Sequence, residues 1–224
     1  SHSYKTWDFS HLNNLYISWE EAMNPFPLDG LIITGAPVEH IPFEKVNYWE
    51  EFAGIVKEAR FKCASTLGLC WAGFALAYMA GVDKENFTKK LFGVYPMRSL
   101  VPGHSLMGTQ DDEFLCPQSR HAGLPDIEME QAEKKGRLRL LAHGEDVGYT
   151  IFETPDQRQL MHLGHPEYNV ARLRSEMERD KKRGDVPPPE NFDLAKSNTS
   201  WRSHRNLLFQ QWLWFCYQHV SLSV

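Results

Sequence analysis

A short segment around Cys70 constrains the fold more than any other part of the sequence. Residues 61–66 (FKCAST) are apolar enough for a buried strand, and residues 74–80 (FALAYMA) are rich in residues that favour helix. Between them, Cys70 stands among small residues at the predicted turn from strand to helix. The positive end of the helix dipole would face the sulfur and favour its thiolate form. The pattern is that of a nucleophile elbow, with a buried core cysteine as the alternative.

The remaining pattern predicts a three-layer α/β domain with a doubly wound, mostly parallel sheet. The chain has 224 residues, of which 42% are hydrophobic, so one domain can bury a sizeable core. An apolar run at 31–35 predicts a buried parallel strand, and apolar residues at helical spacing predict a helix over 49–60. Further strands are predicted at 137–142, 147–153 and 159–163, and further helices at 18–23, 170–182 and 206–220. The alternation of strands and helices indicates helices on both faces of the sheet.

Composition and charge exclude several classes of function. The net charge is −5, and the only basic run is at 181–183, so we expect no nucleic-acid partner. No apolar run is long enough to cross a membrane, so we expect no membrane partner. The four cysteines are scattered without CxxC spacing, which predicts reduced thiols in a cytoplasmic protein. The ten histidines form no HExxH pair, so we expect no metal site.

His165-Pro166-Glu167 is the second chemical signal, and it directly follows a predicted strand 95 positions after Cys70 (165 − 70). A cysteine nucleophile needs a base to share its proton and a third group to orient that base. Histidine titrates in the right range, and a carboxylate two positions later can hold the imidazole in one tautomer. The alternative is a surface loop with an incidental His and Glu. The two motifs together are more specific than either one alone.

This combination resembles the class I glutamine amidotransferase-like superfamily, which pairs an elbow cysteine with a later His-x-Glu. The surroundings of the cysteine, Leu69-Cys70-Trp71-Ala72, resemble the homoserine O-succinyltransferase and O-acetyltransferase family within it. Other matching segments run through the chain in order: DGLIITGAP (29–37), KLFGVY (90–95), DDEF (111–114), PQSR (117–120), GHPEY (164–168) and SWRSH (200–204). The resemblance implies a glutamine amidotransferase-like fold with a flavodoxin-like core.

The resemblance also implies a ping-pong acyl transfer with acetyl-CoA as co-substrate and no resident cofactor. Cys70 would carry the acyl group as a thioester, His165 would activate the acceptor hydroxyl, and Glu167 would orient His165. The backbone N–H of Trp71 would serve the oxyanion hole. The implied reaction is that of a homoserine O-acetyltransferase, in methionine and cysteine biosynthesis.

The resemblance assigns substrate roles to four more residues. Lys90, Ser119 and Arg179 match family positions that contact the amino acid, and an arginine can clamp a carboxylate with two hydrogen bonds. Glu39 matches the position that separates acyl donors, where glycine accompanies succinyl and glutamate accompanies acetyl. A carboxylate there would fill the pocket and repel the free carboxylate of a succinyl group. Without the resemblance, all four would be interpreted as ordinary solvated polar residues.

Two departures from the family pattern bear on these expectations. The resemblance implies that residues 1–224 are a single acyltransferase domain without the family's N-terminal segment, which in relatives holds the first core strand and a lysine assisting the oxyanion hole. We expect that segment to exist elsewhere, or this site to be incomplete. Pro96-Met97-Arg98 follows Tyr95, where the family usually has Glu-His. Because we expect this region to lie near the substrate, L-serine is an alternative acceptor to L-homoserine.

Other readings of the same residues stay open. One is homoserine O-succinyltransferase activity, and a more remote one is a glutaminase-type hydrolase on the same fold. A third is a binding module without catalysis, which the intact set of Cys70, His165 and Glu167 argues against. We also expect a homodimer, because family relatives commonly form one.

Overall fold

The computed structural model describes residues 14–24, 28–107, 110–184, 188–195 and 198–220. Its centre is a seven-stranded sheet in the order β1-β2-β7-β6-β5-β3-β4. The strands are β1 (Gly30–Ile33), β2 (Ser65–Leu69), β3 (Glu85–Ser99), β4 (Glu113–Gly123), β5 (Arg139–Gly144), β6 (Gly148–Glu153) and β7 (Gln159–His162). The helices are α2 (Trp19–Ala22), the 3-10 turn η1 (Phe43–Lys45), α3 (Trp49–Lys62), α4 (Trp71–Met79), α5 (Asp126–Lys134), α6 (Val170–Arg183) and α7 (Arg202–His219).

The sheet is mixed, with a parallel part and an antiparallel part. β1 pairs with β2 and β2 with β7 in parallel, whereas β7-β6, β6-β5, β5-β3 and β3-β4 are antiparallel. The α/β class is therefore confirmed, but the expectation of a mostly parallel sheet is corrected: only the three strands at one end of the sheet, β1, β2 and β7, are parallel. The antiparallel strands follow from short hairpin connections, such as the turn that returns β5 to β6 between Gly144 and Gly148.

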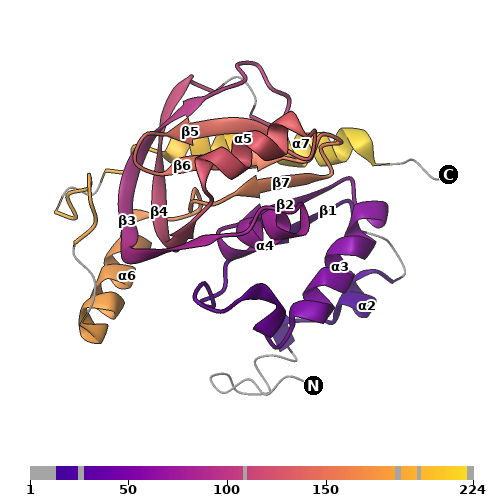
Figure 1. The fold of residues 1–224 in the computed structure, drawn as a ribbon, viewed down its shortest axis with the longest axis horizontal. Coiled ribbons are helices and arrows are strands. Elements are labelled where there is room, and N and C mark those ends of the chain that lie inside the picture. Colours follow the sequence, from indigo (N-terminus) through magenta and orange to yellow (C-terminus); the bar gives the residue numbers. More distant parts are fainter. Residues whose placement is uncertain (1–13, 25–27, 108–109, 185–187, 196–197, 221–224) are drawn as a thin grey trace.

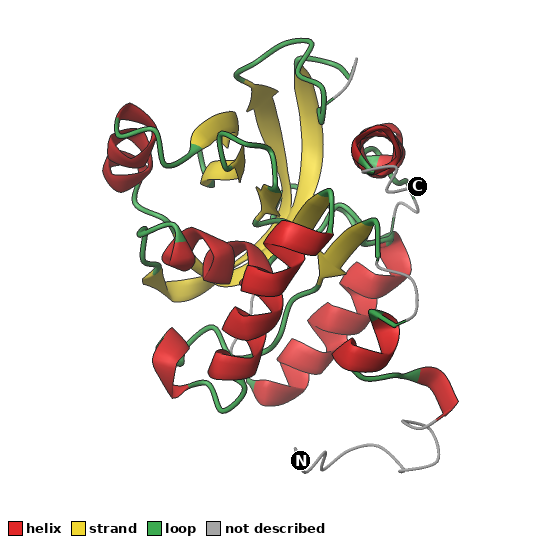
Figure 2. Ribbon diagram, turned by 90° about the vertical axis from the view of Figure 1, so that its right-hand side faces the viewer, coloured by secondary structure: helices red, strands yellow, loops and turns green. Residues whose placement is uncertain are grey.

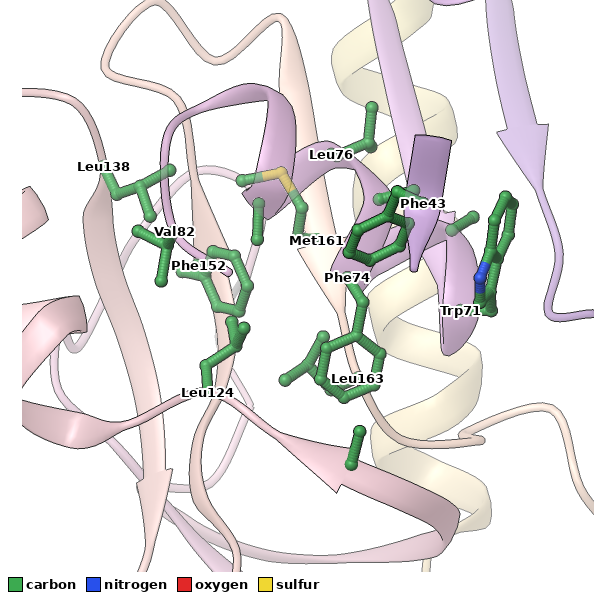
Figure 3. Close-up of a cluster of buried hydrophobic side chains, with 14 of the residues drawn as sticks. Phe43, Trp71, Phe74, Leu76, Val82, Leu124, Leu138, Phe152, Met161 and Leu163 are labelled. Atoms are coloured by element: carbon green, nitrogen blue, oxygen red, sulfur yellow. The ribbon is translucent and has the colours of Figure 1, made fainter. Parts of the chain in front are cut away.

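Helices cover both faces of the sheet, as predicted. One core cluster joins α3, α4 and α5 to one face, with Phe74 and Phe152 among its members (Figure 3). The other cluster packs α7 against the opposite face, where the Trp212 indole donates to the Ser65 hydroxyl at 3.2 Å. In Figures 1 and 2, α7 lies across the sheet from α3 and α4. A third cluster holds α6 beside β3.

Strand β2, which lies between β1 and β7, explains why the elbow is rigid. All five of its residues are buried, because helices cover both of its faces. A side chain at Gly68 would lie 2.7 Å from a Leu76 methyl and 3.1 Å from the Ala72 backbone, so glycine is what lets α4 approach this strand. The turn between β2 and α4 is thus fixed by close packing on its inner side.

Several sequence predictions were shifted or missed. α3 continues through Phe61 and Lys62, so the elbow strand is β2 at 65–69 rather than 61–66. The long strands β3 and β4 and the helix α5 were not predicted from the sequence. The strands predicted at 137–142, 147–153 and 159–163 correspond to β5, β6 and β7.

Two further findings concern cysteines and membranes. All four cysteines are free and buried, which agrees with the predicted reduced thiols. Among the described residues, no helix combines the length and the apolar character needed to span a membrane.

Candidate active site

Cys70 stands at the turn from β2 to α4 in a strained backbone conformation. Its φ is 52° and its ψ is −117°, in the region that residues other than glycine rarely adopt. It is the N-cap of α4, so the free N–H groups and positive dipole end of the helix lie next to the sulfur. Gly35, two residues after the end of β1, is close by, since a Cβ there would be 3.4 Å from the Cys70 Sγ. This is the geometry that the sequence predicted for a nucleophile elbow.

His165 reaches the site from the loop after β7. Its backbone N–H donates to the Pro117 carbonyl at 2.8 Å, which ties the loop to β4. Its Nδ1 lies 2.7 Å from the Glu167 Oε1, and its ring stacks on Tyr168 with centroids 4.1 Å apart. Glu167 therefore fixes the imidazole from one side, and the Nε2 remains for the sulfur or a substrate.

The electrostatics of His165 connect it to Cys70. Burial alone would lower the pKa of His165, but the Cys70 sulfur, through charge and a hydrogen bond, and the Glu167 carboxylate raise it to about 10. The imidazolium is the favoured form in this setting, and it is the partner that an anionic sulfur requires. Cys70, His165 and Glu167 are thus one coupled group rather than three separate side chains.

These three residues share one cavity of about 380 Å³. Ser119, Arg179 and Glu39, which the sequence also predicted, are in its wall. The side chains of Trp71 and Lys90 are not among those lining it. For Trp71 the predicted role belongs to its backbone N–H, which begins α4 directly after Cys70. Pro96, Met97 and Arg98 line a different hollow, so they are not placed in the wall around Cys70.

Lys90 lies behind the wall, in a buried network of charges. Its Nζ is 2.7 Å from the Glu176 Oε1 and 2.6 Å from the Asp180 Oδ2. Arg179, which is half-exposed, pairs with the same two carboxylates at 3.0 and 3.1 Å. The Ser119 hydroxyl donates to Glu176 as well. Among the described residues, the two positive and two negative charges of this network cancel. Their ion pairs hold one face of α6 against β3 and β4.

Glu176 is ionised by this network. Burial alone would raise the pKa of Glu176, but the Lys90 ammonium and hydrogen bonds from Lys90, Ser119 and Tyr168 lower it to about 2. A buried carboxylate that stays charged is suited to an ammonium group, since an opposite charge at short range offsets its desolvation.

Sequence reasoning assigned no role to seven residues of the wall, which are Thr34, Gly35, Ala36, Pro37, Tyr168, Arg172 and Glu176. The last three stand with Arg179 at helical spacing after His165, so their common face could have been recognised from the sequence. Arg172 is exposed, and its guanidinium lies 5.4 Å from the centre of the Tyr168 ring. No carboxylate of the described residues is paired with it. Across those residues there is also no cluster of three or more side chains suited to a metal ion.

The comparison with protein families identifies the chain. The family model described as "HTS: Homoserine O-succinyltransferase" matches residues 1–222. The chain belongs to this family. It is therefore an acyltransferase by membership, as the family resemblance implied.

Curated relatives carry two different names within the family. The homoserine O-acetyltransferase of Agathobacter rectalis is 39% identical over 219 residues, which is 94% of this chain and 69% of that protein. The homoserine O-succinyltransferase of Psychromonas ingrahamii is 38% identical over 218 residues, or 94% of this chain and 70% of that protein. The two identities are too similar to choose between the donors.

Solved structures confirm the predicted fold family. A glutamine amidotransferase from Thermotoga maritima superimposes with a TM-score of 0.64, covering 83% of this chain and 77% of that one. The sequence identity is 14%, so the likeness concerns the fold alone. The glutamine amidotransferase-like fold expected from the sequence is thereby confirmed.

Proposed function

We propose that this protein is a homoserine O-acetyltransferase that transfers the acetyl group of acetyl-CoA through a thioester on Cys70. The observation that carries the proposal is the convergence of Cys70, His165 and Glu167 on one cavity, with the sulfur at a helix N-terminus. Family membership supports the reaction class, and the relatives' names support homoserine as acceptor.

In the first half-reaction, the Cys70 thiolate attacks the carbonyl carbon of acetyl-CoA. The Trp71 N–H, free at the first turn of α4, donates to the oxyanion that forms. The carbon–sulfur bond to CoA then breaks, and the His165 imidazolium gives its proton to the leaving thiolate. The enzyme is left with an acetyl thioester on Cys70 and a neutral imidazole.

In the second half-reaction, His165 takes the proton of the acceptor hydroxyl, and the oxygen attacks the thioester carbonyl. The carbon–sulfur bond to Cys70 breaks, which releases O-acetylhomoserine and restores the thiolate beside the imidazolium. The cavity wall suits an amino-acid zwitterion, because Arg179 and Arg172 can receive a carboxylate and the ionised Glu176 an ammonium. Lys90 and Ser119 act in this proposal by holding Glu176 in place.

Acetyl is the proposed donor because Glu39 is in the cavity wall. The backbone carbonyls of Glu39 and Ile41 both accept hydrogen bonds from the Lys84 ammonium, so the loop is anchored. A second carboxylate, on a succinyl group, would be repelled there. Pro96–Arg98, the reason for considering serine, line another hollow, which favours homoserine over serine as acceptor.

Intact-mass spectrometry tests the proposal. The full chain is mixed with acetyl-CoA or succinyl-CoA, and peptide mapping locates any added acyl group; homoserine, serine or water is then supplied. We expect one acetyl group on Cys70, removed quickly by homoserine and slowly by serine or water. Labelling at another residue would contradict the mechanism, as would loss of the label at the same rate in water. Release of ammonia from glutamine would instead support a glutaminase.

A further inference from the structure

Arg120, in the middle of β4, is a fully buried charge with no charged partner. Its side chain is 0% exposed. Its Nε donates to the Gln118 Oε1 at 3.1 Å, its Nη1 to the Ala122 carbonyl at 2.5 Å and its Nη2 to the Val147 carbonyl at 2.6 Å. All three acceptors are neutral, and no carboxylate among the described residues forms an ion pair with Arg120.

Such an arrangement is costly unless something compensates the charge. A buried ion without a counter-ion loses its hydration, and proteins usually pair or neutralise it. Burial lowers the pKa of Arg120 to about 10, while Cys70, Tyr95 and Cys116, groups that become negative on ionisation, act in the opposite direction. The guanidinium therefore stays protonated at neutral pH. Its three hydrogen bonds and the rings of Phe74 and Phe87, whose centres are 6.0 and 5.4 Å away, offset part of its desolvation, but no anion balances its charge.

The position of Arg120 indicates what balances it. The guanidinium lies over the ring of Phe74, 6.0 Å from its centre, and Phe74 belongs to the first turn of α4, where its N–H donates to the Cys70 carbonyl at 3.1 Å. A cation near a helix N-terminus is unfavourable, because the dipole is positive there. Neither the helix nor an ion pair explains this residue, whereas an anion on Cys70 would offset both costs.

We infer that Arg120 is a fixed counter-charge for the anionic form of Cys70 and for the oxyanion that forms beside it. The inference rests on the proposed role of Cys70 as the nucleophile. Arg120 acts on Cys70 through its electric field and not by contact with a substrate, so it is a positioning residue and not a catalytic one. The titratable groups that share the cavity wall with the sulfur are His165, Glu167, Glu39, Tyr168, Arg172, Glu176 and Arg179. Cys116 and Tyr95, whose hydroxyl donates to Glu190 at 2.8 Å, interact with Arg120 instead.

The pH dependence of Cys70 alkylation tests this role without any substrate. The rate of iodoacetamide addition to Cys70 is followed by peptide mapping in the full chain. In Arg120→Met we expect the midpoint of the profile to rise by about one pH unit, so that the rate at any pH below the midpoint falls about tenfold. Arg120→Lys keeps the charge and should keep the midpoint. Arg98→Met, which removes an exposed arginine from the neighbouring strand, is the matched control and should behave as the parent.

Two outcomes would overturn the inference: an unchanged midpoint in Arg120→Met, or an equal rise in the Lys variant. If Arg120→Met does not fold, Gln118→Glu gives Arg120 a carboxylate of the same shape as its present amide partner. That variant should raise the midpoint, whereas Gln118→Met should not, and an unchanged midpoint in Gln118→Glu would count against the role. If acetyl-CoA did not label Cys70 but Arg120→Met still shifted the midpoint of alkylation, only the proposed function would be refuted.

Discussion

The two parts of the sheet hold their site residues in different ways. The parallel strands β1, β2 and β7 place Cys70 and His165 by backbone geometry, at a strained turn and in a loop tied to β4. The antiparallel strands β3 and β4 and the helix α6 supply Ser119, Glu176 and Arg179, which are held by a network of side-chain charges. We infer that the parallel part carries the chemistry and the other part carries recognition of the acceptor. Substitutions in the two parts should therefore affect different half-reactions.

The largest expected effect follows removal of the sulfur. Cys70→Ser should lower kcat/KM by at least about 10⁴-fold, because a serine hydroxyl at this position lacks the thiolate that the site is built to stabilise. Acyl labelling from acetyl-CoA should disappear with it. Cys116→Ser, which alters a cysteine buried outside the cavity wall, is the control. If Cys70→Ser and Cys116→Ser both fold and lose comparable activity, the proposed division of roles between the two parts of the sheet would be wrong.

His165 belongs to the same part, and its replacement should lower activity by about 10²–10⁴-fold. A second readout uses stability. The pKa of His165 is raised above its unfolded value near 6.5, so its charge stabilises the folded state fully below that pH. This contribution is lost as the pH rises toward about 10.

Urea denaturation of the parent and of His165→Gln, at pH values from 6 to 10, measures that contribution. The difference in the free energy of unfolding should be largest at pH 6 and should shrink as the pH increases. A difference that is constant across this range would show that the imidazolium is not stabilised by Cys70 and Glu167.

How much the sequence could predict differs between the two parts. Cys70 and the His165-Pro166-Glu167 loop were found because each is a local pattern that directly follows an apolar strand. The elbow strand was placed four residues early, since the exposed Phe61 at the end of α3 resembles a strand residue. Local periodicity therefore located the chemistry but not the exact boundaries of its elements.

The antiparallel strands β3 and β4 were missed for reasons that the structure explains. Pro96 and Pro117 argue against strands, but β4 is at the edge of the sheet, and β3 pairs with β5 only at Arg98 and Ser99. Neither proline therefore breaks a ladder in the centre of the sheet. The charge network was equally invisible, because Lys90 and Glu176 are 86 positions apart and meet only when α6 packs on β3. Arg120 and its lack of a carboxylate likewise depend on the tertiary fold.

In the recognition part, Glu176→Gln should have the next largest effect. It leaves Lys90 with one carboxylate instead of two, and removing one partner from a buried ion pair destabilises a protein by about 3–5 kcal/mol. In the folded fraction, KM for homoserine should rise about 30- to 100-fold. The rate of acetyl transfer to Cys70 should stay within about twofold of the parent's, because that step does not involve the network.

A temperature at which the variant is folded has to be established first, by circular dichroism. Rapid-quench labelling with acetyl-CoA then measures the first half-reaction alone, and the steady-state rate reports on both half-reactions. If the first half-reaction slowed as much as the second, the network would be supporting the elbow itself, and the two parts of the sheet would not be separable.

Glu39 lies between the two parts, in the loop after β1, and it should determine the donor. Glu39→Gly should raise turnover with succinyl-CoA relative to acetyl-CoA at least about tenfold, by removing both a side chain and a like charge. Glu39→Gln separates these causes, since it keeps the volume and removes the charge. Glu44→Gly, at an exposed position nearby, is the control. An unchanged donor ratio in Glu39→Gly would remove the reason for proposing acetyl.

Arg172 should show the smallest effect, and it tests the recognition part most directly. Arg179 and Lys90 are already engaged by Glu176 and Asp180, whereas Arg172 faces the cavity with its guanidinium over an aromatic ring. A carboxylate of the acceptor can therefore pair with Arg172 without breaking an existing ion pair. Because the residue is exposed, the pair is worth about 1 kcal/mol, which corresponds to a rise of about fivefold in KM for homoserine in Arg172→Gln.

Arg174→Gln is the matched control for this prediction. Arg174 is an exposed arginine on the same helix, and its Nη2 donates to the Leu194 carbonyl at 2.8 Å, away from the cavity wall. The two variants remove the same charge from α6, so any general effect of net charge on substrate attraction is shared between them. A rise in KM for homoserine that is confined to Arg172→Gln, with KM for acetyl-CoA unchanged, assigns Arg172 to the acceptor. If KM for acetyl-CoA rose instead, Arg172 would contact the donor's phosphates, and the recognition part would serve both substrates.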